Sequence, residues 1–345
     1  MKALVVGLGS AGQRHARNLR QLTNGRAQLL TCRSRGWDLV IDAQLNATFG
    51  RRPEEAYGIT NFPSLDLALA ERPDVVVVAN PISMHVPVAR QAVEAGAHVF
   101  VEKPLSDVWD GVEDLIAAAR SRRLVGCVAY QMRFHPGLQR VKALIERGAI
   151  GRVVSAAFHF GEYLPGMHPY EDYREGHAAR RDQGGGVVRA LSHEIDTARW
   201  LFGEPRRVYA GGGHLSSLEI DVEDVAMIQL ECERDGRRLP VMVYLDFVQR
   251  PTRRYCEIVG DEGTLRWDYH QQLVARYDPA AGEWEEEITP LDRNQMFLDE
   301  MRDFLDAAAA GRPPAVTLED GAGTLRVALA ALESMESGQA REVTT

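Results

Sequence analysis

A glycine-rich turn between an apolar strand and a helix constrains this chain more than any other feature. Residues 2–6, Lys-Ala-Leu-Val-Val, are long enough for one buried strand and too short for a helix. They run into Gly7-Leu8-Gly9-Ser10-Ala11-Gly12, a G-x-G-x-x-G spacing, and residues 13–20 have a helical pattern. The first glycine allows a tight turn, the second lets backbone approach a pyrophosphate, and the third lets the helix pack close to the strand. Because unpaired N–H groups at a helix N-terminus attract phosphate, this stretch predicts a dinucleotide-binding turn.

The length and composition of the chain fit a two-domain protein of the cytoplasm. At 345 residues, the chain exceeds what one ordinary hydrophobic core holds, and 45% of its residues are hydrophobic. Its apolar runs stay well short of the roughly 18 residues that a membrane span needs. Because the first strand starts at the N-terminus, no signal peptide is expected. A net charge of -9 argues against a nucleic-acid partner, since phosphate backbones are bound by basic surfaces.

Strands and helices alternate through the first third of the chain. Residues 27–32 read as a second strand, 38–52 as a helix, and 75–79 as a strand of almost pure valine. Further strands are predicted at 98–101 and 124–129. Continuous β-branched runs belong in a parallel sheet that is covered on both faces. The pattern therefore predicts an α/β, doubly wound Rossmann domain, with the boundary placed at residues 1–124.

The end of the second predicted strand indicates which dinucleotide is bound. An enzyme that selects NAD usually has Asp or Glu there to bind the ribose 2′-hydroxyl, but no acidic residue lies between Gln13 and Trp37. Arg33, Ser34 and Arg35 occupy this place instead. Arginine binds phosphate with a bidentate fork, so NADP(H) is the preferred cofactor, with NAD(H) possible. Exposed loop arginines without a ligand are the alternative.

The second predicted domain, residues 125–345, has the pattern of an α+β fold. Adjacent strands without intervening helices predict a largely antiparallel sheet with one open face. A hairpin turn is expected at residues 261–263. The predicted strands are residues 152–160, 207–211, 224–232, 239–247, 254–259 and 263–268.

The densest candidate chemistry precedes and follows a glycine run at residues 184–186. A helix predicted from Val187 to about residue 202 holds His193 and Asp196, which are three apart and share a face. The carboxylate could then orient the imidazole, and histidine suits proton exchange with a carbinol. A hydrogen-bonded core histidine is the alternative for His193, and an ion pair with Arg199 is the alternative for Asp196.

Arginines gather ahead of that glycine run although the chain is acidic overall. Arg174, Arg180 and Arg181 form the cluster, which favours an anionic substrate such as a sugar acid or a nucleotide-linked sugar. Solvated loop arginines are an equal alternative. Four histidines in the same half lack the spacing and the cysteines of a zinc site, so no metal is expected.

Glu102-Lys103-Pro104, at the end of a predicted strand, completes a recognisable set of motifs. Together with the N-terminal glycine turn and the later glycine run before His193, it resembles the glucose-fructose oxidoreductase, inositol dehydrogenase and rhizopine-catabolism (Gfo/Idh/MocA) family. The resemblance spans the whole chain and implies an NAD(P)-dependent oxidoreductase of sugars and cyclitols. It implies that Lys103 positions the substrate hydroxyl and the nicotinamide, that the Lys103-Pro104 bond is cis, and that His193 is the catalytic histidine.

The resemblance also implies an assembly and carries one departure. In this family the open sheet face is the subunit interface, so a homodimer or homotetramer is expected. The family's pattern has an Asp shortly before the histidine, whereas residues 188–191 are Val-Arg-Ala-Leu. The family's arrangement of two acid/base residues is therefore in doubt, and a larger part of the acid/base catalysis is expected of Lys103.

These arguments yield three sets of expected site residues. The catalytic pair is Lys103 and His193. The residues expected to bind the cofactor are Gly7, Gly9, Ser10, Ala11, Gly12, Arg33, Ser34, Arg35, Asn80, His85, Glu102 and Lys103. Those expected to bind the substrate are Lys103, Arg133, Tyr173, Arg174, Arg180, His193 and Asp196.

The leading hypothesis is hydride transfer between a nicotinamide and a hydroxyl or ketone carbon of a sugar, cyclitol or sugar acid. Two other classes stay open. One is a redox-inert regulator that binds dinucleotide or sugar, because fold alone does not settle function. The other is an NAD-dependent glycoside hydrolase that oxidises its substrate transiently.

Overall fold

The chain folds into two compact units. The computed structural model describes residues 1–33, 36, 38–42 and 45–343. The first unit comprises residues 1–130 and 293–322, and the second comprises residues 131–292 and 323–345. The boundary expected after residue 124 is therefore displaced, because β8 (Gly126–Val128) pairs with β7 (His98–Val101) in the first sheet. A C-terminal segment also returns to the first unit, which the sequence did not indicate.

The first unit is built on a six-stranded sheet in which every pairing is parallel. The strand order is β5-β2-β1-β6-β7-β8, which confirms the predicted doubly wound fold. The four valines of β6 are completely or almost completely buried, as expected of a central strand covered on both faces. The remaining strands are β1 (Lys2–Val6), β2 (Gln28–Cys32), β5 (Thr60–Phe62) and β6 (Val75–Val78).

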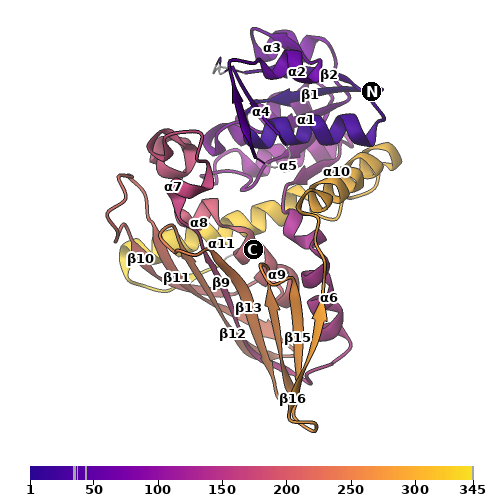
Figure 1. The fold of residues 1–345 in the computed structure, drawn as a ribbon. Helices are drawn as coiled ribbons and strands as arrows, with labels where there is room; N and C mark the ends of the chain where they lie inside the picture. Colours follow the sequence, from indigo (N-terminus) through magenta and orange to yellow (C-terminus); the bar gives the residue numbers. More distant parts are fainter. Residues whose placement is uncertain (34–35, 37, 43–44, 344–345) are drawn as a thin grey trace. The chain divides into compact units, whose positions relative to one another are not determined.

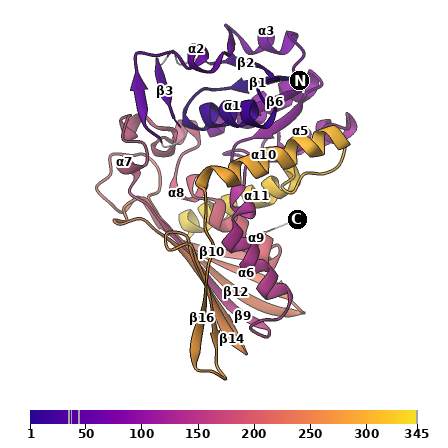
Figure 2. The same cartoon turned by 45° about the vertical axis from the view of Figure 1, so that its right-hand side comes forward.

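Helices pack on this sheet, and one of them comes from the C-terminal part of the chain. Helix α10 (Arg293–Ala310) lies beside α1 (Ser10–Leu22) in both views (Figures 1 and 2). The Asn294 amide donates to Asn18 at 3.0 Å, and the Arg14 guanidinium lies 4.1 Å from the centre of the Phe297 ring. The other helices of this unit are α2 (Pro53–Tyr57), α3 (Leu65–Ala70), α4 (His85–Glu94) and α5 (Val112–Ser121).

The helix predicted over residues 38–52 is wrong. A small antiparallel hairpin of β3 (Leu39–Ile41) and β4 (Ala47–Phe49) is found there, with residues 43 and 44 outside the described residues. The side chain of Gln13 explains it, because its amide donates to the Leu39 carbonyl at 2.9 Å and accepts from Ile41 N–H at 2.8 Å. A helix over residues 38–52 would use the Leu39 carbonyl internally, so the hydrogen bond from Gln13 in α1 favours the extended form.

The second unit contains a nine-stranded sheet in the order β16-β15-β14-β13-β9-β12-β11-β10-β17. All neighbours are antiparallel except β9 and β12, so the predicted largely antiparallel sheet is confirmed. Strands β15 and β16 were not predicted. The bounds are β9 (Val153–Gly161), β10 (Arg207–Gly213), β11 (Val225–Arg234), β12 (Arg237–Asp246), β13 (Arg253–Gly260), β14 (Gly263–Asp268), β15 (Leu273–Asp278), β16 (Glu283–Ile288) and β17 (Arg341–Glu342).

Helices contact one face of this sheet (Figure 2). Along β11, Ala226, Ile228 and Leu230 are buried, whereas Met227 is exposed, and strand alternation places the two sets on opposite faces. Among the helices are α6 (Pro136–Glu146), α7 (Leu164–Met167), α8 (Val187–Ala190) and α9 (His193–Phe202), while α11 (Leu318–Ser337) begins in the first unit and ends in the second.

Replacing Gly12 with alanine should destabilise the first unit. A Cβ on Gly12 would lie 1.9 Å from the Gly7 carbonyl oxygen, which is rigid backbone. Gly7 cannot retreat, because it has φ +91° and a Cβ built on it would lie 2.6 Å from the Ala79 oxygen. We expect Gly12→Ala to lower the free energy of unfolding by about 3 kcal/mol in urea titrations.

Gly9→Ala is the matched control for that experiment. No described atom lies within 4 Å of a Cβ built on Gly9. This variant should therefore retain its stability to within about 1 kcal/mol. Equal losses in the two variants would contradict the packing role of the third glycine.

Candidate active site

The glycine turn leaves several polar groups facing no protein partner. Helix α1 begins at Ser10, and its N-cap residue, Gly9, has no side chain that could cap the N–H groups of the first turn. Within the described residues, the Ser10 hydroxyl and both amide atoms of Asn80 are buried without a hydrogen-bond partner. Buried polar groups are normally paired, so such a group indicates a ligand. These residues and the first turn of α1, which includes Ala11, fit a dinucleotide phosphate.

Residues of the candidate site lie just after three neighbouring strands of the first sheet. Gly7 follows β1, Asn80 lies two residues beyond β6, and Glu102 follows β7. In an open parallel sheet, ligands bind at the carboxyl ends of the strands. The order β1-β6-β7 therefore brings the glycine turn, the Asn80 amide and the Glu102-Lys103 pair to one edge of the first unit.

Arg33 is bound by a carboxylate that the sequence analysis did not identify. Its Nε donates to Oε1 of Glu54 at 2.7 Å and its Nη2 donates to Oε2 at 2.9 Å. The two side chains are only 8% and 7% exposed. The guanidinium expected to meet a 2′-phosphate is thus already in a bidentate ion pair, while Ser34 and Arg35 lie outside the described residues.

Glu102 connects the segment after β7, which contains Lys103, to helix α1. Its Oε1 lies 2.7 Å from Nε2 of His15, which is fully buried in α1, and its Oε2 accepts from the backbone N–H of Lys103 at 3.2 Å. Lys103 itself is half-buried, and the expected cis Lys103-Pro104 bond is confirmed. The Glu102 carboxylate therefore holds the backbone of Lys103 against the element that starts the dinucleotide site.

This contact should make the stability of the first unit fall at acid pH. Burial by itself would raise the pKa of Glu102, but the hydrogen bond and charge of His15 outweigh it and lower the pKa from 4.5 to about 2. A carboxyl group with a lower pKa in the folded chain stabilises it above the unfolded pKa, and this contribution is lost as the pH falls. Lowering the pH from about 6 to about 3 should remove about 2 kcal/mol of unfolding free energy through this group.

Urea titrations across that pH range, followed by circular dichroism, test this effect. In Glu102→Gln, the unfolding free energy should fall less between about pH 6 and about pH 3, because the titrating carboxyl group is gone. Asp110→Asn, on an exposed carboxyl of the same unit, is the control and should leave this pH dependence unchanged. An unchanged pH dependence in Glu102→Gln would show that another group causes it.

Both ring nitrogens of His85 lie near backbone carbonyl oxygens. Its Nδ1 lies 2.8 Å from the Pro104 carbonyl oxygen and its Nε2 lies 3.0 Å from that of Asn80. Burial lowers the pKa of this histidine, although both carbonyls oppose the shift. The neutral ring carries one N–H, so it donates to one of these two carbonyls at a time and links the segments after β6 and β7. The expected cofactor contact of His85 stays a prediction.

In the second unit, His193 is the first residue of α9. The helix predicted through residues 187–202 is interrupted at Leu191 and Ser192, which separate α8 from α9. The His193 side chain is largely buried, and the amide nitrogen of Gln131 lies 3.2 Å from its Nε2. An amide N–H of Gln131 therefore donates to the imidazole, a partner that lies 62 residues away in sequence.

Asp196 and Arg133, two expected substrate residues, bind each other. Arg133 Nε donates to Oδ2 at 2.9 Å and Nη2 donates to Oδ1 at 2.7 Å. Thr324 also donates to Oδ1, and Asp196 is completely buried. The prediction that Asp196 orients the imidazole is wrong, because its carboxylate is occupied by Arg133. The alternative of an ion pair with Arg199 is also found, because Nη1 of Arg199 lies 3.8 Å from Oδ1 of Asp196.

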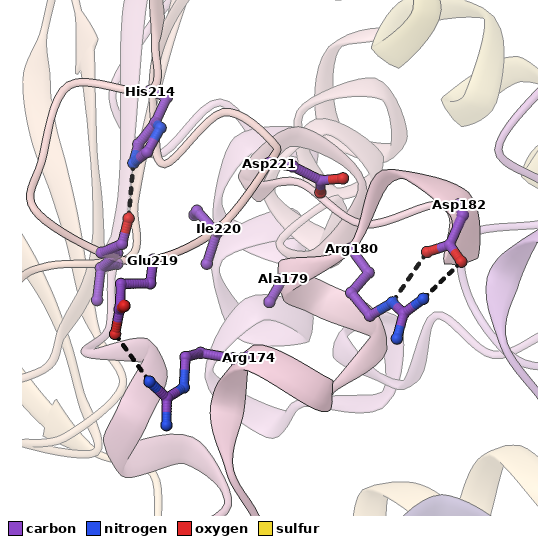
Figure 3. Close-up of a pocket in the computed structure, with 9 residues that line it drawn as sticks. Arg174, Ala179, Arg180, Asp182, His214, Glu219, Ile220 and Asp221 are labelled. Carbon is purple, nitrogen blue, oxygen red and sulfur yellow. Dashed lines mark hydrogen bonds and ion pairs between the residues drawn. The ribbon is translucent and has the colours of Figure 1, made fainter.

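Two other expected substrate residues, Arg174 and Arg180, line a surface pocket of about 460 Å³ (Figure 3). Arg174 binds Asp172 and Glu219, and Arg180 binds Asp182 with two hydrogen bonds. Two arginines of the predicted cationic cluster are thus paired with carboxylates, whereas the Arg181 guanidinium donates to the backbone carbonyl of Asp221. The Tyr173 hydroxyl accepts from Glu219 N–H and lies outside the lining. The lining comprises Arg174, Ala179, Arg180, Asp182, His214, Leu218, Glu219, Ile220 and Asp221.

Family models match both units of the chain. Residues 1–130 match the oxidoreductase family with an NAD-binding Rossmann fold, and residues 138–266 match the GFO/IDH/MocA C-terminal domain. The chain belongs to the Gfo/Idh/MocA family. It is an oxidoreductase whose first unit is an NAD-binding Rossmann domain. No helix in the described residues is both long enough and apolar enough to cross a membrane.

Similar members of the Gfo/Idh/MocA family span nearly the whole chain. Inositol 2-dehydrogenase 3 of Saccharopolyspora erythraea is 28% identical, over 97% of this chain and 93% of the relative. Inositol 2-dehydrogenase of Rubrobacter xylanophilus is 28% identical, over 99% and 92%. The crystal structure of GenD2 from gentamicin A biosynthesis in complex with NAD has 26% identity and a TM-score of 0.79, covering 100% of this chain and 97% of GenD2.

In this member of the Gfo/Idh/MocA family, the buried Glu223 contacts the segment before His193 that lacks an acidic residue of its own. Oε1 of the buried Glu223 accepts from Val188 N–H at 3.2 Å, and a Cβ on Gly186 would lie 2.2 Å from the same oxygen. Burial raises the pKa of Glu223, and the nearby Arg189 partly offsets it. A carboxyl group therefore does lie beside the glycine run, and it comes from 35 residues further along the chain.

Proposed function

We propose that the chain is an NAD(H)-dependent dehydrogenase that moves hydride between the nicotinamide and a CH–OH carbon of a sugar or cyclitol. The observation that carries this proposal is the shared edge of the first sheet. There the glycine turn and the unpartnered Ser10 and Asn80 groups fit the dinucleotide, and Lys103 follows the neighbouring strand. The relatives named inositol 2-dehydrogenase support a polyol substrate.

Two side chains act on the reacting oxygen, each with a different role. The bound nicotinamide would supply or accept the hydride. Lys103 donates a hydrogen bond from its ammonium group to the substrate oxygen, which stabilises the charge that develops there. His193 exchanges the hydroxyl proton, as an imidazole held by Gln131 can do. Lys103 thus orients and polarises, and His193 carries the proton.

NAD(H) is proposed in place of the NADP(H) that the sequence favours. The reason is that the Arg33 guanidinium is already bound by Glu54. A similar structure, GenD2, is described in complex with NAD. NADP(H) stays the alternative that separate titrations of the two dinucleotides decide.

A neutral polyol is proposed as the substrate in place of an anionic one. Arg174 and Arg180 pair with carboxylates, so the pocket does not present the excess positive charge that would attract a sugar acid. A neutral sugar or cyclitol needs only hydrogen-bonding groups. Acidic and nucleotide-linked sugars remain in the test panel for this reason.

A homodimer or homotetramer is proposed through the outer face of the nine-stranded sheet. Tyr209, Met227 and Met242 are each about half exposed, and the strand register places them on the same face. Exposed apolar patches on a sheet are typical of interfaces. Light scattering on the purified chain should give twice or four times the mass of one chain, and a monomer at micromolar concentration would contradict this part of the proposal.

Nicotinamide absorbance with a substrate panel tests the function. The chain is mixed with NAD⁺ or NADP⁺ and with neutral cyclitols, neutral sugars, sugar acids and nucleotide-linked sugars. Reduction of NAD⁺ by a neutral polyol supports the proposal. Dinucleotide binding with no reduction by any member of the panel favours a regulator, and cleavage of a glycoside without net reduction favours a hydrolase.

A further inference from the structure

We propose that Glu54 is the residue that makes the cofactor site discriminate against a 2′-phosphate. This inference rests on the proposed function, because it concerns the dinucleotide that the dehydrogenase uses. Glu54 belongs to α2 and lies 21 residues beyond Arg33, so it does not occupy the usual acidic position after the second strand. The fold brings its carboxylate to that place.

The backbone ties Arg33 to the dinucleotide turn. The Gly7 N–H donates to the Cys32 carbonyl at 3.0 Å, and Val6 and Cys32 are partners in the parallel register of β1 and β2. Arg33 is the next residue. In a Rossmann domain, the end of this strand is where the ribose that carries the 2′-substituent is bound. The Arg33-Glu54 pair is therefore at the position that distinguishes the two cofactors.

The charge of the pair explains the discrimination. A phosphate monoester carries about −1.5 to −2 at pH 7, and its best partner would be the Arg33 fork. The Arg33 guanidinium already donates to both carboxylate oxygens of Glu54, and each of the two side chains is less than a tenth exposed. A 2′-phosphate would have to displace a buried carboxylate and leave it without its cation, which is strongly unfavourable. A 2′-hydroxyl is neutral and can donate to a remaining carboxylate lone pair.

Helix α2 fixes Glu54 in this position. Ile59 N–H donates to the Glu54 carbonyl at 2.8 Å. The Tyr57 hydroxyl receives a hydrogen bond from Arg17 at 3.1 Å and donates to the Ile41 carbonyl at 3.0 Å. The helix is thus attached both to α1 and to the β3-β4 hairpin, so the carboxylate is held in place before a ligand arrives.

Glu54→Gln is the test, because glutamine keeps the shape and removes the charge. The readout is the dissociation constant of NAD⁺ and of NADP⁺, measured by calorimetry on the full chain without substrate. NADP⁺ should bind at least about tenfold tighter to the variant than to the wild type, while NAD⁺ binding changes by less than about threefold. Glu55→Gln, an exposed carboxyl on the same helix, should change neither constant.

The unmodified chain supplies a second measurement that does not depend on the folding of a variant. Adenosine 2′,5′-bisphosphate and 5′-AMP differ only in the 2′-phosphate, and the bisphosphate should bind no tighter than 5′-AMP. A bisphosphate that binds tenfold tighter, or a Glu54→Gln variant whose NADP⁺ binding weakens or stays unchanged, would overturn the inference. If the wild type binds neither dinucleotide, the proposed function fails and this inference with it, whereas tight NAD⁺ binding with an unchanged Glu54→Gln preference overturns the inference alone.

Discussion

Lys103→Met is expected to reduce turnover by at least about a thousandfold while NAD⁺ binding changes by less than about threefold. Methionine keeps most of the length of the side chain and its apolar stem but has no N–H to donate. The hydrogen bond to the reacting oxygen is then missing when charge develops there. The proposed dinucleotide contacts are kept, because we assign them to the glycine turn and to Asn80. Steady-state rates and calorimetry measure the two effects separately.

The control for this prediction is another lysine of the chain. Lys142→Met removes an ammonium group that pairs with Glu146 on α6, and it should leave the rate unchanged. Lys103→Arg should fail to restore turnover, since the planar guanidinium fork is wider than an ammonium point charge. A Lys103→Met variant with wild-type turnover would remove Lys103 from the mechanism.

His193→Ala is expected to lower turnover by about a hundredfold to ten thousandfold, in keeping with the loss of a proton-transfer group. Gln131 would lose its imidazole partner, and a small cavity would remain at the start of α9. Added imidazole should therefore restore part of the rate in a concentration-dependent way. A purely structural histidine would give a less stable variant that free imidazole does not rescue.

An exposed histidine of the same unit gives the matched control. His270 lies in the turn between β14 and β15, and His270→Ala should keep full turnover. Thermal unfolding of both variants separates a loss of fold from a loss of chemistry. Full activity in His193→Ala would contradict the assignment of the proton transfer to this residue.

The parts of the fold that local sequence determines could be predicted. The β1 strand, the glycine turn and α1 follow one another directly, and the run of four valines in β6 predicts a buried strand. The β3-β4 hairpin could not be predicted, because the side chain of Gln13 selects it from another element. Strand β16 was missed because its sequence, Glu-Trp-Glu-Glu-Glu-Ile, lacks the alternation of apolar residues that marks a half-buried strand.

The candidate site shows the same division between local and distant causes. The positions of Gly7 and Gly12 in the turn after β1, and of Lys103 after β7, could be predicted from motifs that are continuous in sequence. The roles of these residues stay predictions. The partners of the charged residues were not, since Glu54 and Glu223 reach their contacts across 21 and 35 residues. Counting arginines therefore predicted a cationic cluster, whereas the fold pairs Arg174 and Arg180 with carboxylates.

The central claim is that Lys103 of the first unit and His193 of the second act on one hydride transfer. The direct test is the single-turnover rate of deuterium transfer to NAD⁺ from the best polyol of the panel, labelled at the reacting carbon. We predict that Lys103→Met and His193→Ala each slow this transfer strongly, and that the double variant is about as slow as the slower single variant, because groups that act as a unit are not additive. Losses that multiply in the double variant, or a wild-type chain that transfers no deuterium from any polyol, would contradict the claim.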